Sequence, residues 1–202
     1  MGLMYFSVDT ETTGVEPQKN QIIEFGAIFE DPNKTMKFSD IPKFKRIIRY
    51  ETYVGSSVAI NMNARIFAIL SKFDRMKPSA FKDEYAKENG IITAEELIPQ
   101  FKEFAIECYA KYNLSLPATG INIAGKNFGG FDAQFIKFLE NAFQLKINYV
   151  MGDPSTLYTD FYKDEVFASL STCKERAGFG SEVTHDALED AWDVVKLLRK
   201  KY

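Results

Sequence analysis

Three runs of strand-forming residues occupy the first 50 positions, and their short connections restrict the fold more than any other feature. The runs are Tyr5–Glu11, Gln21–Glu30 and Lys43–Tyr50, and a turn with Gly14 and Pro17 follows the first of them. Parallel neighbours need a long crossover connection, which these loops are too short to supply. We therefore expect the three strands to pair as an antiparallel meander.

Helical and strand patterns alternate through the rest of the chain. Apolar spacing and capping signals predict helices at Ala64–Phe73, Thr93–Tyr109, Phe131–Phe143, Leu170–Ala177 (ended by Gly178) and Ala187–Lys200. Apolar runs predict a strand at Ala118–Ala124 and a short strand near Tyr149 or Leu157. Strands first, followed by this alternation, predict an α/β fold with helices packed on a mixed sheet. A length of 202 residues fits a single domain over residues 1–202.

Composition excludes several classes of protein. With 46% hydrophobic residues the chain can build a sizeable core and is not globally disordered. Two cysteines argue against a disulfide scaffold, and a single histidine excludes a zinc site of several imidazoles. No secretory signal is visible and no apolar run approaches the roughly 20 residues that span a bilayer, so we expect a cytoplasmic protein without a membrane partner. Because the net charge is −3, binding a polyanion would need local basic patches or metal ions.

Two carboxylates stand close together in the first strand. Asp9 and Glu11 are two residues apart, so their side chains point to the same face of the sheet. Two buried carboxylates on one face repel unless a cation is present or one of them is protonated. The pair is therefore either a solvent-facing strand end or part of a functional site, and the Thr-Thr-Gly turn that follows favours a position at the end of the strand.

A third carboxylate, Asp132, follows a predicted strand and a glycine-rich turn. It stands where a helix is expected to begin. A carboxylate at this position can simply stabilise the helix dipole, so its own context leaves a structural and a functional role open.

The last predicted helix carries a fourth carboxylate among apolar residues. At about 100° per residue, Asp190 falls within an arc formed by Ala187, Ala191, Val194, Leu197 and Leu198. A carboxylate on a buried face needs a partner, whereas Glu189 and Asp193 lie off the arc and are expected to be solvated. Asp186 and Glu189 have the spacing of a capping box, which leaves His185 in the preceding loop, close enough to flank one site with Asp190. His185 by itself could also be an ordinary loop histidine.

These residues, in this order, resemble the DEDDh branch of the DnaQ-like 3'→5' exonucleases. The segments DTETTG, IIEFGAI, FDAQFI and HDALEDA carry the resemblance, which extends from about residue 4 to residue 200. Position 186 is Asp where the tyrosine branch would have Tyr, so the histidine branch fits better. The chain departs from many members at Lys126-Asn127, where they have His-Asn, and in the extra glycines Gly129 and Gly130.

The resemblance implies an RNase H-like fold with a five-stranded mixed sheet, three antiparallel strands and then two further strands, flanked by helices. It also implies two metal ions, Mg²⁺ or Mn²⁺, held by Asp9, Glu11, Asp132 and Asp190. Carboxylate oxygens are suitable ligands for these ions. His185 would be the general base on the attacking water, and the product would be a nucleoside 5'-monophosphate released from a 3' end.

Substrate contacts are expected at Thr12, Met62, Asn63 and Phe131. Thr12 could equally have only a structural role in the turn, and for Phe131 packing in the core is favoured over substrate contact. Glu24 is expected to be buried but away from the metal ions. The basic residues of segment 34–49 have two possible roles. A solvated edge strand is slightly favoured. The alternative is a track that binds phosphates, with Phe44 or Tyr50 available to stack on bases.

Single-stranded DNA is the favoured substrate. An exoribonuclease or oligoribonuclease, a polymerase-associated proofreading subunit with a replication or repair partner, and a catalytically silent binding module remain as alternatives. A silent module is disfavoured because all four carboxylates and the histidine are present.

Overall fold

The computed structural model describes residues 2–148 and 150–202, and its centre is a five-stranded mixed sheet. The strands, in the spatial order β4-β3-β2-β1-β5, are β1 (Tyr5–Thr12), β2 (Ile22–Glu30), β3 (Lys43–Arg49), β4 (Ile91–Thr93) and β5 (Ile123–Ala124). The strands β1, β2 and β3 pair antiparallel as predicted, while β4 and β5 run parallel to β3 and β1. The predicted mixed sheet is therefore confirmed.

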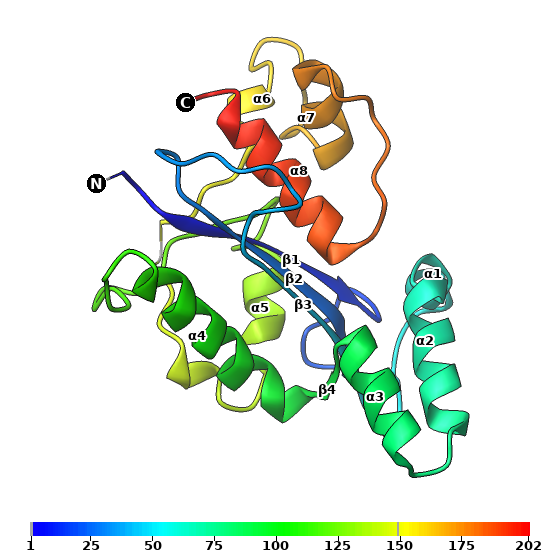
Figure 1. Cartoon of the computed structure of the whole chain (residues 1–202). Coiled ribbons are helices and arrows are strands. Elements are labelled where there is room, and N and C mark those ends of the chain that lie inside the picture. Colours follow the sequence, from blue (N-terminus) through cyan, green and yellow to red (C-terminus); the bar gives the residue numbers. More distant parts are fainter. Residues whose placement is uncertain (1, 149) are drawn as a thin grey trace.

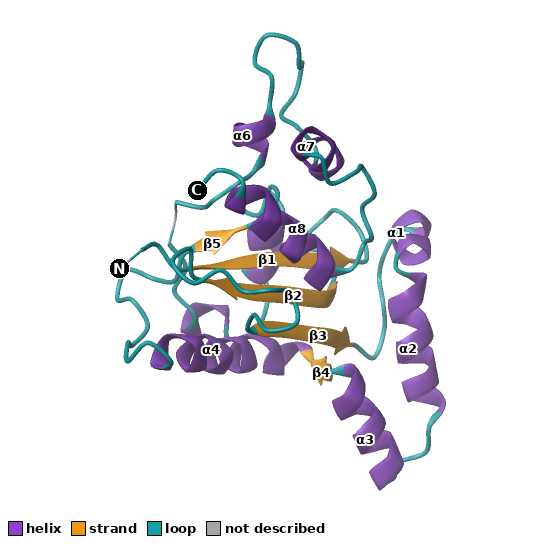
Figure 2. Ribbon diagram, turned by 45° about the horizontal axis from the view of Figure 1, so that its top comes forward, coloured by secondary structure: helices purple, strands orange, loops and turns teal. Residues whose placement is uncertain are grey.

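Helices cover both faces of this sheet and also extend beyond it (Figures 1 and 2). They are α1 (Ser57–Met62), α2 (Ala64–Arg75), α3 (Ala80–Asn89), α4 (Ala94–Ala110), α5 (Asp132–Ile136), α6 (Ser155–Tyr158), α7 (Leu170–Ala177) and α8 (Ala187–Arg199), with a 3₁₀ turn η1 (Ala142–Gln144). Figure 2 shows α8 on one side of the sheet and α4 on the other, while α2 and α3 form an arm beyond the β3–β4 end. None of the helices in the described residues has both the length and the apolarity that a membrane crossing demands.

The alternation of side chains along β1 decides what each face of the sheet buries. Phe6 and Val8 belong to the large core between the sheet and helices α4 and α5. Tyr5 points the other way, into the cluster formed with α8, and Ser7 Oγ donates a hydrogen bond to the Ala191 carbonyl at 2.8 Å. The same alternation sends Asp9 and Glu11 to the α8 face.

Phenylalanine rings fill the core on the α4 side. Phe101 lies between strands and helix, with ring centroids 4.9 Å from Phe25 and 5.5 Å from Phe6. These rings are fully or almost fully buried. Each contributes roughly 1.5–3 kcal/mol through burial, so the high phenylalanine content serves in large part to build this core.

Local signals at helix ends are borne out. Thr93 and Glu96 form the predicted capping box at the start of α4. Helix α7 ends where Gly178 takes a left-handed conformation with φ of 78°, and Asp186 caps α8 through its side chain. These signals depend on a few neighbouring residues, which is why the sequence shows them.

The structure corrects three predicted elements. The helix predicted at Phe131–Phe143 ends at Ile136, because Phe138 and Leu139 donate tighter hydrogen bonds to carbonyls three residues back and the chain then turns at Asn141 with φ of 65°. The strand predicted at Ala118–Ala124 is reduced to β5, since Ile121 instead forms an isolated bridge with Ile147.

The third correction concerns the short strand predicted near Tyr149 or Leu157. Tyr149 lies outside the described residues, Leu157 is in helix α6, and the residue that bridges Ala124 is Gly152. Three elements were not predicted at all: α1, α3 and β4. Of these, β4 has only three residues and depends on β3 for its hydrogen bonds.

Candidate active site

The carboxyl-terminal half of β1 brings the first two carboxylates to the α8 face. In the antiparallel register Asp9 lies opposite Gly26, and Glu11 lies opposite Glu24. The register shifts between Glu11 and Thr12, so regular pairing breaks down immediately after the second carboxylate. Glu11 therefore lies at the end of the strand, as the Thr-Thr-Gly turn predicts, and Asp9 lies two residues before it in the regular ladder.

A glycine on β2 lets the start of α8 come close to these carboxylates. A Cβ atom on Gly26 would lie 2.4 Å from the carbonyl carbon of Ala187, a separation that real Cβ atoms essentially never show. The first turn of α8 therefore rests directly on the backbone of β2, in register with Asp9.

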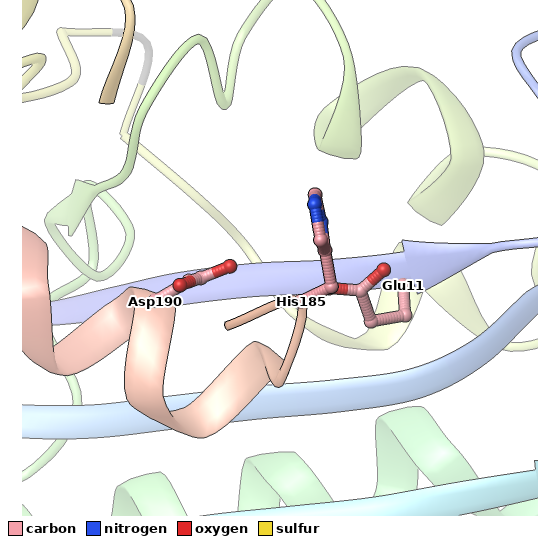
Figure 3. Close-up of side chains that lie close together, drawn as sticks. All are labelled: Glu11, His185 and Asp190. Atoms are coloured by element: carbon pink, nitrogen blue, oxygen red, sulfur yellow. The ribbon is translucent and has the colours of Figure 1, made fainter. Parts of the chain in front are cut away.

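Helix α8 and its cap supply the histidine and another carboxylate. Asp190 lies one turn into α8 and is 4% exposed, which agrees with its predicted place on the apolar arc. His185 precedes the cap, is exposed, and has a left-handed backbone with φ of 52°. Figure 3 shows Glu11 on β1, His185 on the loop and Asp190 on α8. One ligand atom from each lies within 4.8 Å of the others.

Asp132 approaches the cluster from the opposite side of β1. It is the first residue of α5 and is 3% exposed, and its Oδ1 accepts a hydrogen bond from Thr10 Oγ1 at 2.7 Å. Thr10 points away from the α8 face of β1, toward Asp132. Strand β1, which carries Asp9, therefore lies between Asp132 on one face and Asp190 on the other. Helix α5 has only five residues. Its dipole is therefore a weak reason for the acid to be there.

Burial raises the pKa values of all four carboxylates, and neighbouring acids add to the effect at Asp9, Glu11 and Asp190. Burial is the main reason why the pKa of Asp9 lies well above its usual range. The charges of Asp132, Asp190 and Glu11 raise this pKa further. Burial and the nearby Asp190 raise the pKa of Glu11 to about 8, and burial raises the pKa of Asp132 to about 7. Burial and the charge of Asp193 raise the pKa of Asp190 to about 6. Such a site favours either protonated carboxyl groups or bound cations.

The donor set fits divalent metal ions. Carboxylate oxygens are the preferred ligands of hard divalent cations, and positive charge between the acids would relieve their repulsion. The cluster of Glu11, His185 and Asp190 has the separation that a shared ion requires. A divalent-metal site is thus the arrangement that these residues support.

A cavity of about 530 Å³ opens beside the carboxylates. All four predicted substrate contacts line it: Thr12, Met62, Asn63 and Phe131. The sequence-based reasoning missed Val15 and Val58, which are exposed and also line the cavity. No sequence signal marks them, because isolated apolar residues at a surface are common.

Two of these lining residues also have structural partners. Thr12 Oγ1 donates to the Gly14 carbonyl at 2.7 Å, so its hydroxyl serves the turn. Phe131 lies 5.0 Å from the Phe135 ring and packs against the main core while lining the cavity.

Comparison with known proteins assigns the chain to a family. A family model described as Exonuclease (RNase_T) matches residues 6–118, more than half of the chain. The chain belongs to this exonuclease family. The family resemblance drawn from the sequence motifs is therefore confirmed. No curated protein sequence matches the chain.

Solved structures of nucleases share the fold of this exonuclease at low sequence identity. Cell-death related nuclease 4 (CRN-4) has a TM-score of 0.58 at 12% identity, and the nuclease domain of 3'hExo, a DEDDh family member bound to rAMP, has 0.57 at 17%. The zinc-bound E. coli ExoI–ssDNA complex has 0.56 at 15%. Each match covers 98% of this chain, which spans 62%, 90% and 40% of those three chains. The predicted RNase H-like fold is confirmed.

Glu24, which was predicted to be buried but away from the metal ions, has cationic partners. Its side chain is fully buried and lies beside Arg65 and Lys45, and one of its oxygens accepts the Ala187 backbone N–H. Asp193, by contrast, was expected to be solvated, and this is wrong. It is buried between Lys174 and Lys196 because α7 packs against that side of α8, a contact that helix periodicity alone cannot reveal.

The basic segment of the exonuclease is a structural part of the sheet. Strand β3 is not an edge, since β4 pairs with it. Lys45 pairs with Glu24 and Asp186, while Arg46 donates to Gln100 and lies over the Phe44 ring. Phe44 itself is 4% exposed and therefore unable to stack on a base. The edge-strand prediction is wrong for Ile47–Arg49, where β4 pairs with β3, and Phe44 is too buried to stack on a base. A phosphate track along the other basic residues of the segment stays a prediction.

Proposed function

We propose that this chain is a metal-dependent 3'→5' exonuclease that releases nucleoside 5'-monophosphates from the 3' end of single-stranded nucleic acid. One observation carries the proposal: ligand atoms of Glu11, His185 and Asp190 lie within 4.8 Å of one another beside a cavity that Glu11 lines, and the charges of Asp132, Asp190 and Glu11 act on the buried Asp9. The family supplies the exonuclease class, and the convergence indicates which residues act.

In this proposal the four carboxylates hold two divalent cations, Mg²⁺ or Mn²⁺. When bound, such ions lower the pKa of a water molecule and offset charge on phosphate oxygens. Two ions would also balance the charge of the four acids, which offsets the cost of burying them and, at Asp9 and Glu11, the repulsion from neighbouring carboxylates.

His185 acts as the general base. Its ring is exposed on the loop before α8, so water and substrate can reach it. A ring nitrogen takes a proton as the water oxygen forms a bond to phosphorus, and the bond to the 3' oxygen of the preceding nucleotide breaks. Histidine suits this step because a neutral imidazole ring offers a nitrogen that can accept a proton.

The cavity receives the terminal nucleotide. Phe131 and Met62 offer apolar surface for the base, and Asn63 and Thr12 line the same cavity with polar groups. Stacking and apolar contacts of this kind suit an unpaired base and do not select its sequence.

DNA is the favoured substrate, and an exoribonuclease or oligoribonuclease is the second candidate. Structures similar to this fold include ExoI bound to single-stranded DNA and 3'hExo bound to rAMP, and the latter is matched over 90% of its chain. A proofreading role beside a polymerase, a cytoplasmic location and a single domain over 1–202 stay predictions.

The decisive experiment compares 5'-labelled DNA and RNA oligonucleotides of identical sequence with Mg²⁺, with Mn²⁺ and with chelator. A ladder that shortens from the 3' end, and that disappears in Asp9→Ala/Asp190→Ala, supports the proposal. Activity retained in that double variant, or no degradation of either polymer, would contradict it. The ratio of DNA to RNA rates assigns the substrate.

A further inference from the structure

We propose that an ionic cluster of Glu24, Lys45, Arg65 and Asp186, centred on the buried Glu24 carboxylate, positions His185 and links it to the wall of the nucleotide cavity. Arg65 is the positioning residue in the middle of this cluster. The inference rests on the proposed function, because it assigns a role relative to the general base.

The cluster is built around a carboxylate that has no access to solvent. Glu24 on β2 is 0% exposed, and Arg65 Nη2 lies 2.9 and 2.8 Å from its two oxygens. Lys45 Nζ on β3 lies 3.2 Å from Glu24, and the Ala187 N–H donates to Glu24 at 3.0 Å. A buried carboxylate keeps its charge only with such partners, so the positions of the four groups depend on one another.

Asp186 carries the cluster to the residue next to the histidine. Its Oδ2 pairs with Lys45 and lies 3.1 Å from Arg65 Nη2, while its Oδ1 accepts the N–H groups of Leu188 and Glu189. The two residues that follow His185 are therefore both tied to the cluster, Asp186 through its side chain and Ala187 through its backbone.

His185 needs this restraint because its own backbone is strained. A φ of 52° lies in the left-handed region, which is unfavourable for residues with a Cβ atom and persists where the surroundings impose it. Fixing Asp186 and Ala187 holds the end of the loop, and with it the direction of the imidazole ring.

Arg65 connects the same cluster to the substrate side. It lies in the first turn of α2, two residues after Asn63, whose Nδ2 donates to the Thr12 carbonyl at 3.2 Å. Asn63 and Met62 line the cavity, and the Arg65 side chain is 44% exposed. A nucleotide that shifts the start of α2 would therefore move the guanidinium group that holds Asp186.

The test uses the only histidine of the chain as a spectroscopic probe. In untagged protein, imidazole signals in a ¹H–¹⁵N spectrum belong to His185 alone. Arg65→Met should shift or broaden these signals, and Arg65→Lys, which keeps the charge, should restore them in part. Arg75→Met, an exposed charge loss at the far end of the same helix, is the matched control and should leave them in place.

Kinetics provide the second readout. Arg65→Met should lower kcat by about 10- to 100-fold, the usual loss when a supporting partner is removed, with a smaller change in KM. In a His185→Ala background the same substitution should change the rate by less than about twofold, because a residue acting through His185 has nothing left to position.

The outcomes separate this inference from the proposed function. Unchanged His185 signals in folded Arg65→Met, or an equal loss of rate with and without His185, would show a purely structural cluster and refute the inference while the exonuclease assignment stands. Wild-type protein that degrades neither DNA nor RNA would refute the proposed function and the inference together. If Arg65→Met does not fold, Asp186→Asn, which removes the charge that pairs with Arg65 and Lys45, gives the same two readouts.

Discussion

Asp190→Asn should make the metal-free protein more stable at alkaline pH, although it removes a residue of the proposed active site. Burial, with the charge of Asp193, raises the pKa of Asp190 from its ordinary 3.8 to about 6. An acid whose pKa is raised in the folded state stabilises the fold below its unfolded pKa, and this contribution is lost as the pH rises through the folded pKa. Asparagine does not ionise and avoids that loss.

The expected size follows from the shift. A difference of roughly two pKa units corresponds to about 3 kcal/mol, which should appear in full at pH 8 and shrink to below about 1 kcal/mol at pH 4. For a chain of this length about 3 kcal/mol raises the Tm by roughly 6–12 °C. The gain should rise between pH 4 and pH 6 and then level off.

Thermal and urea unfolding at pH 4, 6 and 8, in chelator and in excess Mg²⁺, measure the effect. With Mg²⁺ the order should reverse, because the wild type gains more from ligand binding than a variant with one carboxylate fewer. Glu189→Gln is the matched control, since Glu189 is an exposed neighbour on the same helix. An Asn variant that is less stable than wild type at pH 8 in chelator, or equally altered at pH 4 and pH 8, would refute the reasoning.

Three further predictions test the site, the core and the close approach of α8. Addition of Mg²⁺ at pH 7 should release protons, because burial raises the pKa of Glu11 to about 8 and that of Asp132 to about 7. Titration calorimetry in buffers of different ionisation enthalpy measures the proton release, and a binding heat that does not depend on the buffer would refute it. Phe101→Ala should lower the free energy of unfolding by about 3–5 kcal/mol in urea denaturation, because Phe101 is 2% exposed in the core. Gly26→Ala should lower both stability and activity by displacing the start of α8, and a variant with wild-type Tm and kcat would disprove the close approach.

The parts of the fold that the sequence predicts are those specified by neighbouring residues. Runs of strand-forming residues bounded by turns place the first three strands, and the capping residues around Thr93, Gly178 and Asp186 place helix ends within a residue or two. By contrast, β4 and the reduced β5 depend on pairing with β3 and β1. The hydrogen bonds of a short strand come from its partner, so its own residues carry little signal.

The site divides in the same way. Spacing alone shows that Asp9 and Glu11 share a face, and that Asp190 lies on the buried side of its helix. That these acids meet Asp132 and His185 depends on Gly26 admitting α8 and on α5 lying across β1.

The residue types of the candidate site and the order in which they occur can be read from the chain alone, because motifs and periodicities are local properties. Folding, in contrast, separates the acids of the candidate metal site from the acids that pair with cations of the protein. Glu24 lies opposite Glu11 in the sheet and forms ion pairs with Arg65 and Lys45. Among the described residues, no basic side chain forms an ion pair with Glu11. The difference arises because charges of residues far apart in the sequence act on one another only after folding has brought them together.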